Sequence, residues 1–582
     1  MSSTPNLDTR NHNALWAGVF VESLARGGVR TAVISPGSRS APLAFAFARH
    51  PVIESISVLD ERSAAFFALG LAKATGKPTV LVCTSGSAAA NYYPAIVEAR
   101  ESGVPLLIIT ADRPAELRAC ASGQTIDQQK IYGGYVSFFH ELTTPELSLP
   151  RLRYLRQTAI HALERALLPQ PGPVHLNAPF RDPLSPVPDD GATAAFAAKI
   201  DWNSFFSHVA PNEAGTHMVA TPPTLAPDAH GVIIAGPEQG RDPAAYARTV
   251  GELARKLGWP VLADALSPVR HYGEGAPNVV TAYDAILRNR SAAERLKPET
   301  VLCLGGWPTS KILRSWLDAS DAPTWLMSER MDNRDALHGR TRHSALSLGA
   351  LVELLPGVTA PNEYEGLWAS FERQARQALD GRLQATVELF EGKAAWLLAQ
   401  HLPPETRLSI ANSMPVRDAE YFWPATARRI QPFFNRGANG IDGTLSTAIG
   451  VAHRAARPAV LLTGDLALLH DTNGFLLRSS LQGSLTIVLI NNRGGGIFEH
   501  LPAAEFDPPF EQFFATPQEV DFRSLAATYK VEHVVVRDWA HFTSLVATLP
   551  PAGIRLLELQ TDRKRDAARR KRWFAEISAA LT

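Results

Sequence analysis

The chain has 582 residues, of which 45% are hydrophobic, and its 57 Lys and Arg residues are balanced by 57 Asp and Glu residues. This length allows about three or four domains, each with its own core. A formal net charge of zero excludes the overall positive field with which proteins hold nucleic acid or an acidic membrane surface, so we expect neither partner.

Cysteine usage and hydropathy indicate the compartment. Cys83, Cys120 and Cys303 are far apart and lack CxxC or His/Cys spacing, which argues against a disulfide framework and a zinc site. No apolar run approaches the roughly 18 to 20 residues that span a bilayer, and the first residues lack a continuous apolar signal segment. We therefore expect a cytoplasmic protein without membrane insertion.

Short apolar runs rich in Val, Ile and Leu alternate with longer amphipathic stretches along the whole chain. In chain order they include TAVIS, TVLVCTS, PLLIITA, PVHLNAP, GVIIAG, VLCLGG, LSIAN, AVLLTG, LTIVLINN and RLLELQ. Continuous apolar strands separated by helical segments are typical of parallel sheets covered on both faces. The sequence therefore predicts an α/β fold throughout, with doubly wound parallel sheets.

Two changes in composition predict domain boundaries. Residues 181–231 are rich in Pro, Ala, Asp and Thr with weak periodicity, and a second break occurs at LLPGVTAPNEYEG, residues 354–366. We therefore expect three α/β domains, at residues 1–190, 200–360 and 365–582. A long helical pattern over residues 364–400 is expected to act as a connector into the third domain.

A sequence repeat links the first and third domains. ALGLAKATGKPTVLV (residues 68–82) aligns without a gap with AIGVAHRAARPAVLL (residues 448–462), which places Gly70 opposite Gly450. In the same register Ser85 falls opposite Asp465. Although a helix–turn–strand of this composition also recurs by chance in α/β proteins, the match favours one shared architecture for the two domains.

The stretch VLLTGDLALLHD places a carboxylate where a buried strand ends. Asp465 follows that strand, and the next strand, SLTIVLI, ends at Asn491 and Asn492 before the turn RGGGIF. Ligands of open parallel sheets bind at the carboxyl ends of the strands. A carboxylate, an amide oxygen and backbone carbonyls suit Mg²⁺ and, through it, a diphosphate. The alternative is that these residues are only helix caps and turn formers.

A GD pair followed after one helix and one strand by NN resembles the signature of thiamin diphosphate enzymes, although Leu466 stands where a second Gly is usual. The resemblance implies pyrimidine-binding, central and diphosphate-binding domains. It also implies that Asp465, the Asn492 side chain and the Gly494 carbonyl bind Mg²⁺, or Mn²⁺ in its place. Gly464 and Leu466 would then be cofactor-binding residues.

The same resemblance requires a glutamate at a strand end of the first domain, where it holds N1′ of the aminopyrimidine so that the imino form takes the proton from thiazolium C2. SISVLDERSAAFFALG supplies Glu61 in that place. By itself Glu61 would be a first-turn carboxylate stabilised by the helix dipole. In such enzymes the equivalents of Glu61 and Asp465 come from different subunits, which implies a homodimer with shared active sites, and the family suggests a homotetramer.

Five further motifs narrow the branch. They are SPGSRSAPLAFA (residues 35–46), ADRPAEL (111–117), GQTIDQ (123–128), NSMPVRDAEYF (412–422) and NRGANGIDGTLSTAIG (435–450). Together they closely resemble the 2-succinyl-5-enolpyruvyl-6-hydroxy-3-cyclohexene-1-carboxylate synthase (SEPHCHC synthase, MenD) family of menaquinone biosynthesis. The resemblance implies decarboxylation of 2-oxoglutarate on thiamin diphosphate and 1,4-addition of the succinyl carbanion equivalent to isochorismate. Whether the quinone is menaquinone or phylloquinone stays open.

Both substrates carry carboxylates, which Arg side chains bind bidentately. The residues that the resemblance assigns to isochorismate are Ser38, Arg39, Arg113 and Gln124. Those assigned to the donor-derived succinyl carboxylate are Ser413, Arg417 and Arg436. The expected catalytic residues are Glu61, Arg417 and Arg436. The remaining cofactor contacts are Ser413, Ile441, which would force the cofactor into a V shape, and Ile497 and Phe498, which would pack on the pyrimidine.

Two basic features are less specific. Lys311 in GGWPTSKILRSW is expected to bind substrate, but Ile312 follows where a second basic residue is usual, and a surface lysine at a helix N-terminus is an equal alternative. The basic run at residues 561–577 resembles a nucleic-acid or membrane helix. Because no second basic stripe supports that role, we expect a solvated terminal helix.

Two other functions stay open. An acetolactate synthase or a 2-oxoacid decarboxylase would use the same cofactor, but its small donor would leave Arg417 and Arg436 without a carboxylate. A catalytically silent diphosphate-binding module is the alternative outside the enzymes. Against it, no Walker A sequence and no GxGxxG after a strand is present.

Overall fold

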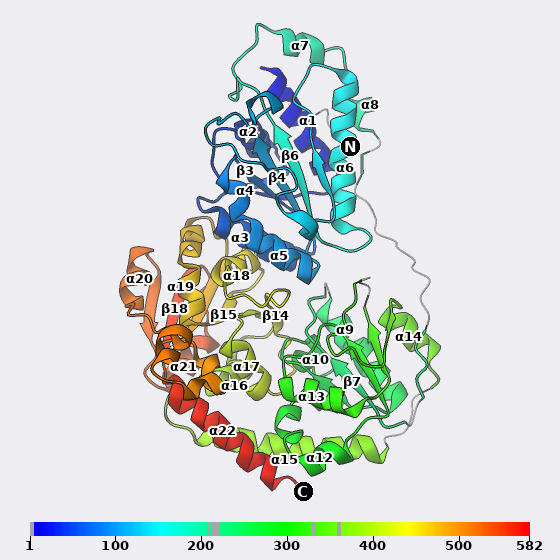
Figure 1. Ribbon diagram of the computed structural model, residues 1–582, viewed down its shortest axis with the longest axis vertical. Helices are drawn as coiled ribbons and strands as arrows, with labels where there is room; N and C mark the ends of the chain where they lie inside the picture. The colour runs from blue at the N-terminus through cyan, green and yellow to red at the C-terminus, as the bar shows by residue number, and fades with distance from the viewer. Residues whose placement is uncertain are drawn as a thin grey trace. The chain divides into compact units, whose positions relative to one another are not determined.

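The computed structural model describes residues 5–207, 209–210, 222–226, 229–240, 242–276, 278–328, 330, 332–357 and 362–582. The chain forms two compact units (Figure 1). The first unit comprises Met1–Thr216, Asn435–Val451 and Asp471–Ser480, and the second comprises His217–Phe434, Ala452–His470 and Leu481–Thr582. The predicted boundaries at residues 181–231 and 354–366 fall partly outside the described residues.

The first unit contains a parallel six-stranded sheet of order β2-β1-β3-β4-β6-β5. Its strands are β1 (Thr31–Ile34), β2 (Glu54–Ser57), β3 (Thr79–Cys83), β4 (Leu106–Asp112), β5 (Phe139–Glu141) and β6 (Pro173–Pro179). Its helices are α1 (His12–Arg26), α2 (Ala41–Arg49), α3 (Glu61–Thr75), α4 (Ser87–Asn91), α5 (Tyr93–Ser102), α6 (Leu149–Leu167), α7 (Ala192–Ala197) and α8 (Trp202–Phe206). Figure 1 shows α3 and α5 on the opposite side of this sheet from α1. Every residue of β4 is buried, as a central strand covered on both faces requires.

The second unit contains two parallel six-stranded sheets, of orders β12-β11-β10-β7-β8-β9 and β14-β13-β15-β16-β18-β17. The strands of the former are β7 (Gly231–Ala235), β8 (Val261–Ala263), β9 (Val279–Val280), β10 (Thr300–Leu304), β11 (Thr324–Met327) and β12 (Thr341–Ser344). Those of the latter are β13 (Arg407–Ile410), β14 (Gln431–Phe433), β15 (Ala459–Gly464), β16 (Ser484–Asn491), β17 (Glu532–Val535) and β18 (Gly553–Gln560). One buried core extends from β7 to β15.

Helices α15 (Glu363–Ala385) and α22 (Arg563–Ala580) pack against each other beside that core (Figure 1). The other helices before α15 are α9 (Pro243–Leu257), α10 (Pro268–His271), α11 (Tyr283–Ile286), α12 (Arg290–Arg295), α13 (Lys311–Ser320) and α14 (Leu348–Leu354). Those after it are α16 (Glu391–His401), α17 (Met414–Phe422), α18 (Thr444–Ala452), α19 (Asp465–His470), α20 (Phe522–Thr528) and α21 (Trp539–Ala547). Among the helices that the structure describes, none combines the length and apolarity needed to cross a bilayer.

The predicted repeat is confirmed by topology. Numbered from its own first strand, the first sheet has the order 2-1-3-4-6-5, and the sheet of β13 to β18 has the same order. The sheet of β7 to β12 instead has the order 3-2-1-4-5-6, read from its other edge. The two outer sheets therefore share one fold that the middle sheet does not have, and the predicted α/β class with parallel sheets is confirmed.

The predicted helical pattern at residues 364–400 forms two helices, α15 and α16, with a break between them. At the break the hydroxyl of Thr386 donates to the carbonyl of Arg382 at 2.8 Å. The ammonium of Lys393 donates to the carbonyls of Gln384 and Thr386, at 3.2 and 2.7 Å. These bonds satisfy carbonyls that a C-terminal turn leaves free, so the chain can change direction within an otherwise helical pattern.

The prediction of a solvated terminal helix is wrong in part. The basic run forms α22 as expected, but Arg563 and Arg570 on it are buried. Arg570 pairs with Glu391 at 2.6 Å and with Asp418 at 2.7 Å. A run of basic residues is expected to be solvated unless acidic residues elsewhere in the chain pair with it. Here the acidic partners lie on α16 and α17, far from α22 in the sequence.

Candidate active site

The carboxyl ends of β15 and β16 form the corner that the sequence predicted. The two strands are adjacent and parallel, with Gly464 paired to Ile490. Asp465 is the first residue of α19 and Asn492 directly follows β16, and both side chains are buried. The structure thus brings the predicted carboxylate and amide to one edge of one sheet.

The Asp465 carboxylate is held by backbone donors. Its Oδ1 accepts the N–H of Leu466 at 2.8 Å, and its Oδ2 accepts the N–H of Gly494 at 2.8 Å. Burial raises the pKa of Asp465 to about 6 in spite of these donors. A buried carboxylate with so little compensating charge is stabilised in its ionised form by a cation placed against it.

Asn492 presents an oxygen that lacks a partner. Its amide nitrogen donates to Oε1 of Glu391 at 2.8 Å, while its Oδ1 is buried and accepts no hydrogen bond. Within the described residues no group of three or more His, Cys, Asp or Glu side chains could hold a metal. A cation site here must therefore combine the carboxylate with amide and backbone oxygens, a donor set that fits Mg²⁺.

The Gly-rich turn after β16 has no room for side chains. Gly494 has a φ of 129°, and a Cβ there would lie 2.4 Å from the carbonyl oxygen of Ala515. By contrast, nothing lies within 4 Å of a Cβ built on Gly464, so the strand end opposite is open. Ile497 and Phe498 follow in the short helix Gly496–His500 and are half-buried.

Ser413 and Arg417 lie together at the start of α17. Ser413 precedes this helix with a φ of 69°, and Nη1 of Arg417 donates to its carbonyl at 2.7 Å. Burial, and then the charge of Arg314 on α13, lower the pKa of Arg417. Arg417 is thus a desolvated cation with a second cation, Arg314, in its neighbourhood. An anionic ligand would stabilise the charge of Arg417.

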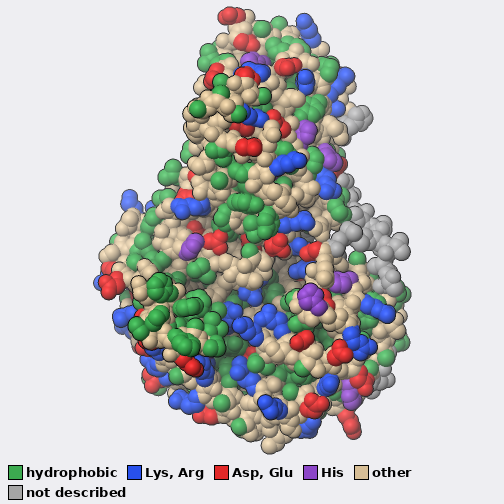
Figure 2. Space-filling view, in the orientation of Figure 1, with side chains coloured by type: hydrophobic (Ala, Val, Ile, Leu, Met, Phe, Trp, Pro, Cys, Tyr) green, Lys and Arg blue, Asp and Glu red, His purple; other side chains and the backbone are tan. Residues whose placement is uncertain are grey.

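Lys311 is the exposed first residue of α13, one turn before Arg314. This position agrees with a surface lysine, but it also places the start of α13 in the neighbourhood of Arg417. Figure 2 shows Lys and Arg side chains gathered around a hollow over the region where Figure 1 places α13, α16 and α17. The basic residues Lys311, Arg314 and Arg417 all lie in the second unit.

Glu61 is the first residue of α3, and Asp60 caps that helix by accepting the N–H of Arg62 at 2.9 Å. The Arg62 side chain holds the pKa of Asp60 down, at about 2. Two residues beyond Glu61, the hydroxyl of Ser63 faces the buried carboxylate of Asp471. The start of α3 is thus fixed from both sides, and Glu61 is half-buried there.

The loop that carries Arg436 and Ile441 is fixed by a buried ion pair that the sequence did not reveal. Lys73 on α3 pairs with Glu98 on α5 at 3.4 Å and donates to Oδ1 of Asn435 at 2.9 Å. The Glu98 carboxylate accepts the backbone N–H groups of residues 437 and 438, at 3.1 and 2.7 Å. One carboxylate on two successive N–H groups sets the course of the loop.

Burial lowers the pKa of Arg39, and the charge of the nearby Arg113 lowers it further. Nη1 of Arg39 donates to the carbonyl of Phe180 at 2.9 Å, but its Nε is buried without a partner. Ser38, beside it, is exposed. These groups form a second cationic region, in the first unit.

Ser85 contacts two predicted substrate-binding residues, Arg113 and Gln124. Its hydroxyl accepts a hydrogen bond from Arg113, and its carbonyl accepts the amide of Gln124 at 3.0 Å. Residue-by-residue reasoning missed Ser85 as a site residue, although the repeat placed it opposite Asp465. At the position where the third domain has Asp465, the first domain has Ser85, whose hydroxyl contacts the guanidinium of Arg113.

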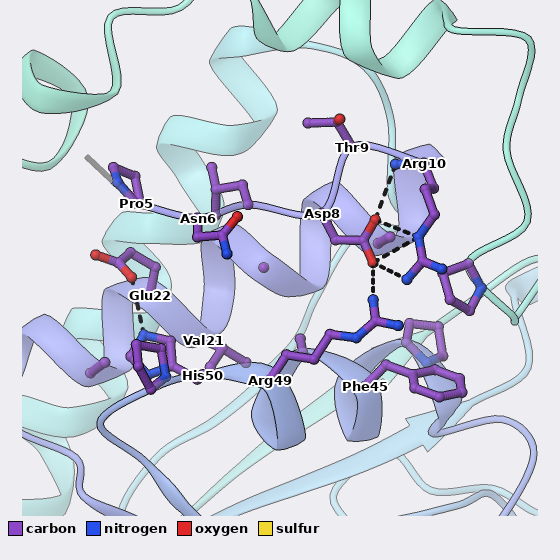
Figure 3. A pocket seen from close by; sticks show the side chains of 18 of the residues that line it. Pro5, Asn6, Asp8, Thr9, Arg10, Val21, Glu22, Phe45, Arg49 and His50 are labelled. Carbon is purple, nitrogen blue, oxygen red and sulfur yellow. Dashed lines mark hydrogen bonds and ion pairs between the residues drawn. The ribbon is translucent and has the colours of Figure 1, made fainter. Parts of the chain in front are cut away.

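A pocket of about 900 Å³ in the first unit is a different feature (Figure 3). Figure 3 shows Asp8 bonded to Arg10 and Arg49, and Glu22 bonded to His50. Its two acidic side chains are thus paired with basic ones, while Arg30 donates to the backbone carbonyls of Ala25 and Val29. None of the predicted site residues lines it within the part of the chain that the structure describes.

Three family models match the chain in succession. They are "Thiamine pyrophosphate enzyme, N-terminal TPP binding domain" over residues 16–131, "Middle domain of thiamine pyrophosphate" over 220–410, and "Thiamine pyrophosphate enzyme, C-terminal TPP binding domain" over 415–552. Among solved structures, a benzoylformate decarboxylase from Polynucleobacter necessarius is similar with a TM-score of 0.67 and 16% identity, over 94% of this chain and 98% of that one. At that identity the similarity shows the fold alone.

Curated relatives match at much higher identity. The 2-succinyl-5-enolpyruvyl-6-hydroxy-3-cyclohexene-1-carboxylate synthase of Microcystis aeruginosa is 53% identical, over 98% of this chain and 99% of the relative. That of Acaryochloris marina is 49% identical, over 99% of this chain and 100% of the relative. The chain belongs to the SEPHCHC synthase family of thiamine pyrophosphate enzymes. The resemblance found in the motifs is thereby confirmed, and so is the expectation of an enzyme that uses thiamin diphosphate with a divalent metal.

Proposed function

We propose that this chain acts as a SEPHCHC synthase: it decarboxylates 2-oxoglutarate with thiamin diphosphate and Mg²⁺, and transfers the succinyl unit to isochorismate by 1,4-addition in menaquinone biosynthesis. The identity of about half of all residues with relatives of that name, along nearly the whole chain, carries this proposal. The chemistry of the two cationic regions supports it, since a protein without net charge concentrates Arg where dicarboxylate substrates are expected.

Asp465, Oδ1 of Asn492 and the carbonyl of Gly494 would hold the cation. The open space at Gly464, with Leu466 nearby, would receive the diphosphate. When bound, thiamin diphosphate supplies the carbon centre at which the 2-oxo acid loses CO₂. The orphaned Oδ1 of Asn492 and the raised pKa of Asp465 support the metal assignment. Manganese would fit the same oxygen ligands.

Glu61 would hold a proton at N1′ of the aminopyrimidine, which requires a carboxylate fixed at the start of α3. Ile441 would press the two rings together, and Ile497 and Phe498 would pack against the pyrimidine. The bonds of Glu98 to the backbone of residues 437 and 438, a few residues before Ile441, support a set course of this loop.

Arg417 and Arg436, with Ser413, would bind the donor carboxylate that remains after decarboxylation. Arg39, Arg113, Ser38 and Gln124 would bind the carboxylates and hydroxyl of isochorismate, and Ser85 would orient Arg113 and Gln124. Lys311 would add a cation at the edge of the donor region. These assignments place acceptor recognition in the first unit and much of donor recognition in the second.

The remaining expectations belong to the same proposal. The domains are assigned as pyrimidine-binding at residues 1–190, central at 200–360 and diphosphate-binding at 365–582, in keeping with the three sheets and the successive family models. The enzyme is proposed to be a cytoplasmic homodimer with shared active sites that associates further into a homotetramer. Light scattering of the purified protein would measure the mass directly.

The first experiment is mass spectrometry of purified protein incubated with Mg²⁺, thiamin diphosphate, isochorismate and either 2-oxoglutarate or pyruvate. A succinylated product formed only from 2-oxoglutarate, and lost after chelation of the metal, supports the proposal. A product from pyruvate instead would favour an acetolactate synthase or decarboxylase. No turnover with either donor would favour a silent binding module.

A further inference from the structure

A carboxamide can bind a cation only through its oxygen, so the orientation of the Asn492 side chain decides whether it is a ligand. Its oxygen and nitrogen have nearly the same shape, and rotation by a half-turn exchanges them. What fixes the orientation is the partner on the nitrogen side. In this structure that partner is the carboxylate of Glu391, at 2.8 Å.

Glu391 is the first residue of α16 and is 2% exposed. Its Oε1 accepts the Asn492 amide, and its Oε2 accepts Nη2 of Arg570 at 2.6 Å. Its backbone N–H donates to Oδ2 of Asp566 at 3.2 Å. Both carboxylate oxygens are therefore engaged, each with a donor of its own.

Arg570 is itself held in place. It lies on α22, is 2% exposed, and forms a bidentate pair with Asp418, through Nε at 2.8 Å and Nη2 at 2.7 Å. The planar guanidinium binds two carboxylates from two other helices at once. Its geometry leaves Glu391 one orientation, with Oε1 toward Asn492.

We propose that Glu391, held by Arg570, is a positioning residue for the divalent cation: by accepting the amide hydrogens of Asn492 it turns Oδ1 of that amide toward the metal. This inference rests on the metal assignment in the proposed function. An ionised carboxylate can only accept hydrogen bonds, so it admits the nitrogen of Asn492 and excludes the oxygen. The buried Oδ1 without a partner is the direct consequence.

Partners behind a metal ligand typically change metal affinity by about 10- to 100-fold when they are removed. Glu391→Gln keeps the size of the side chain. Because Arg570 can only donate, the Gln oxygen stays toward Arg570 and the Gln amide nitrogen faces Asn492, which draws the oxygen of Asn492 away from the metal. We expect this variant to bind Mn²⁺ about tenfold or more weakly. Mn²⁺ binding is measured by electron paramagnetic resonance on the full chain with saturating thiamin diphosphate, without reference to turnover.

Glu372→Gln is the matched control. Glu372, on α15 in the same unit, accepts hydrogen bonds from Thr281 and from the N–H of Ala282. It is joined to those two residues and not to Asn492, so its substitution should leave Mn²⁺ affinity unchanged. A fall in affinity equal to that of Glu391→Gln would assign the effect to general loss of a hydrogen-bonded carboxylate and overturn the inference.

A second variant tests the mechanism by rescue. In Glu391→Gln combined with Asn492→Asp, the Gln amide can donate to one oxygen of the new carboxylate and leave its other oxygen for the metal. The double variant should therefore recover Mn²⁺ affinity that Glu391→Gln alone has lost. A double variant that stays as weak as the single variant, with an intact thermal unfolding transition, contradicts an orienting role.

The remaining outcomes distinguish a failure of this inference from a failure of the proposed function on which it rests. If the wild-type chain does not bind Mn²⁺, the metal assignment and the proposed function fail together. If the wild type binds and Glu391→Gln binds equally well, only the positioning role fails. Should Glu391→Gln not fold, Arg570→Lys replaces the bidentate fork by a single point charge, and unchanged Mn²⁺ affinity in that variant would overturn the inference in the same way.

Discussion

Gly70 and Gly450, which the sequence repeat aligns, face each other where α3 crosses α18. A Cβ added at Gly70 would lie 2.2 Å from the carbonyl oxygen of Thr447, and one added at Gly450 would lie 2.3 Å from that of Phe67. Thr447 and Phe67 are themselves opposite each other in the repeat. Helices α3 and α18 thus meet, within the first unit, through one contact made twice, as a local two-fold arrangement of the two helices requires.

Gly70→Ala should destabilise the enzyme, because the added methyl collides with backbone that cannot move aside locally. Overpacking of this kind typically costs about 1 to 3 kcal/mol. Gly381→Ala is the control, since Gly381 lies in α15 and a Cβ there meets nothing within 4 Å. That control should be neutral or slightly stabilising. Equal melting temperatures for both variants would show that the crossing tolerates a side chain.

Glu61→Gln should leave folding and cofactor affinity nearly intact while slowing activation of the cofactor. Loss of a positioned acid or base typically costs about 10²- to 10⁴-fold. The measurement is hydrogen–deuterium exchange at thiazolium C2, followed by NMR after rapid quenching. Glu363→Gln is the control, since Glu363 also begins a helix but is exposed at the start of α15. Wild-type exchange in Glu61→Gln would remove Glu61 from the mechanism.

Arg417→Gln should impair use of 2-oxoglutarate more than use of isochorismate. A hydrogen bond to a charged group contributes about 1.5 to 3 kcal/mol, which corresponds to roughly 10- to 100-fold in kcat/KM for the donor. Arg429→Gln serves as control, because Arg429 is exposed and pairs with Glu274 at 3.0 Å. Steady-state kinetics with each substrate varied in turn gives the comparison. Equal losses for donor and acceptor would contradict a donor-specific role.

Asp471→Asn should change how stability depends on pH. Burial raises the pKa of Asp471 from 3.8 to about 6, against hydrogen bonds from the N–H and hydroxyl of Ser446. The unfolded chain then releases this proton at lower pH than the folded chain, so the contribution of Asp471 to stability falls as pH rises from about 4 to about 6. The loss approaches roughly 3 kcal/mol, at 1.36 kcal/mol for each pKa unit.

The variant does not titrate at this position, so its stability relative to the wild type should rise across the same window and stay level above it. Thermal unfolding at several pH values measures the difference. Asp318→Asn, at an exposed position on α13, controls for loss of a surface carboxylate. A constant difference between Asp471→Asn and wild type across this range would show that Asp471 is not buried as a titrating group.

Much of this architecture could be predicted from local pattern. Uninterrupted apolar strands indicated parallel sheets, and the Gly464–Asp465 pair at a strand end indicated a ligand site, because the direction of a parallel strand determines which end meets the ligand. The break between α15 and α16 was not predictable in this way. It depends on carbonyls satisfied by Lys393, which is helical by pattern and distinctive only by what it contacts.

The sequence by itself determined the α/β class, the repeat, the family and the residues expected at the site, since each of these depends on residue type and spacing along the chain. Only the tertiary structure decided that the basic helix α22 is partly buried, that Glu391 faces Asn492, and that Glu98 holds the loop of Arg436. The physical reason is that a charge becomes buried and directional only when partners from distant segments replace its water. Residue type records the charge, whereas the fold decides which partners it meets.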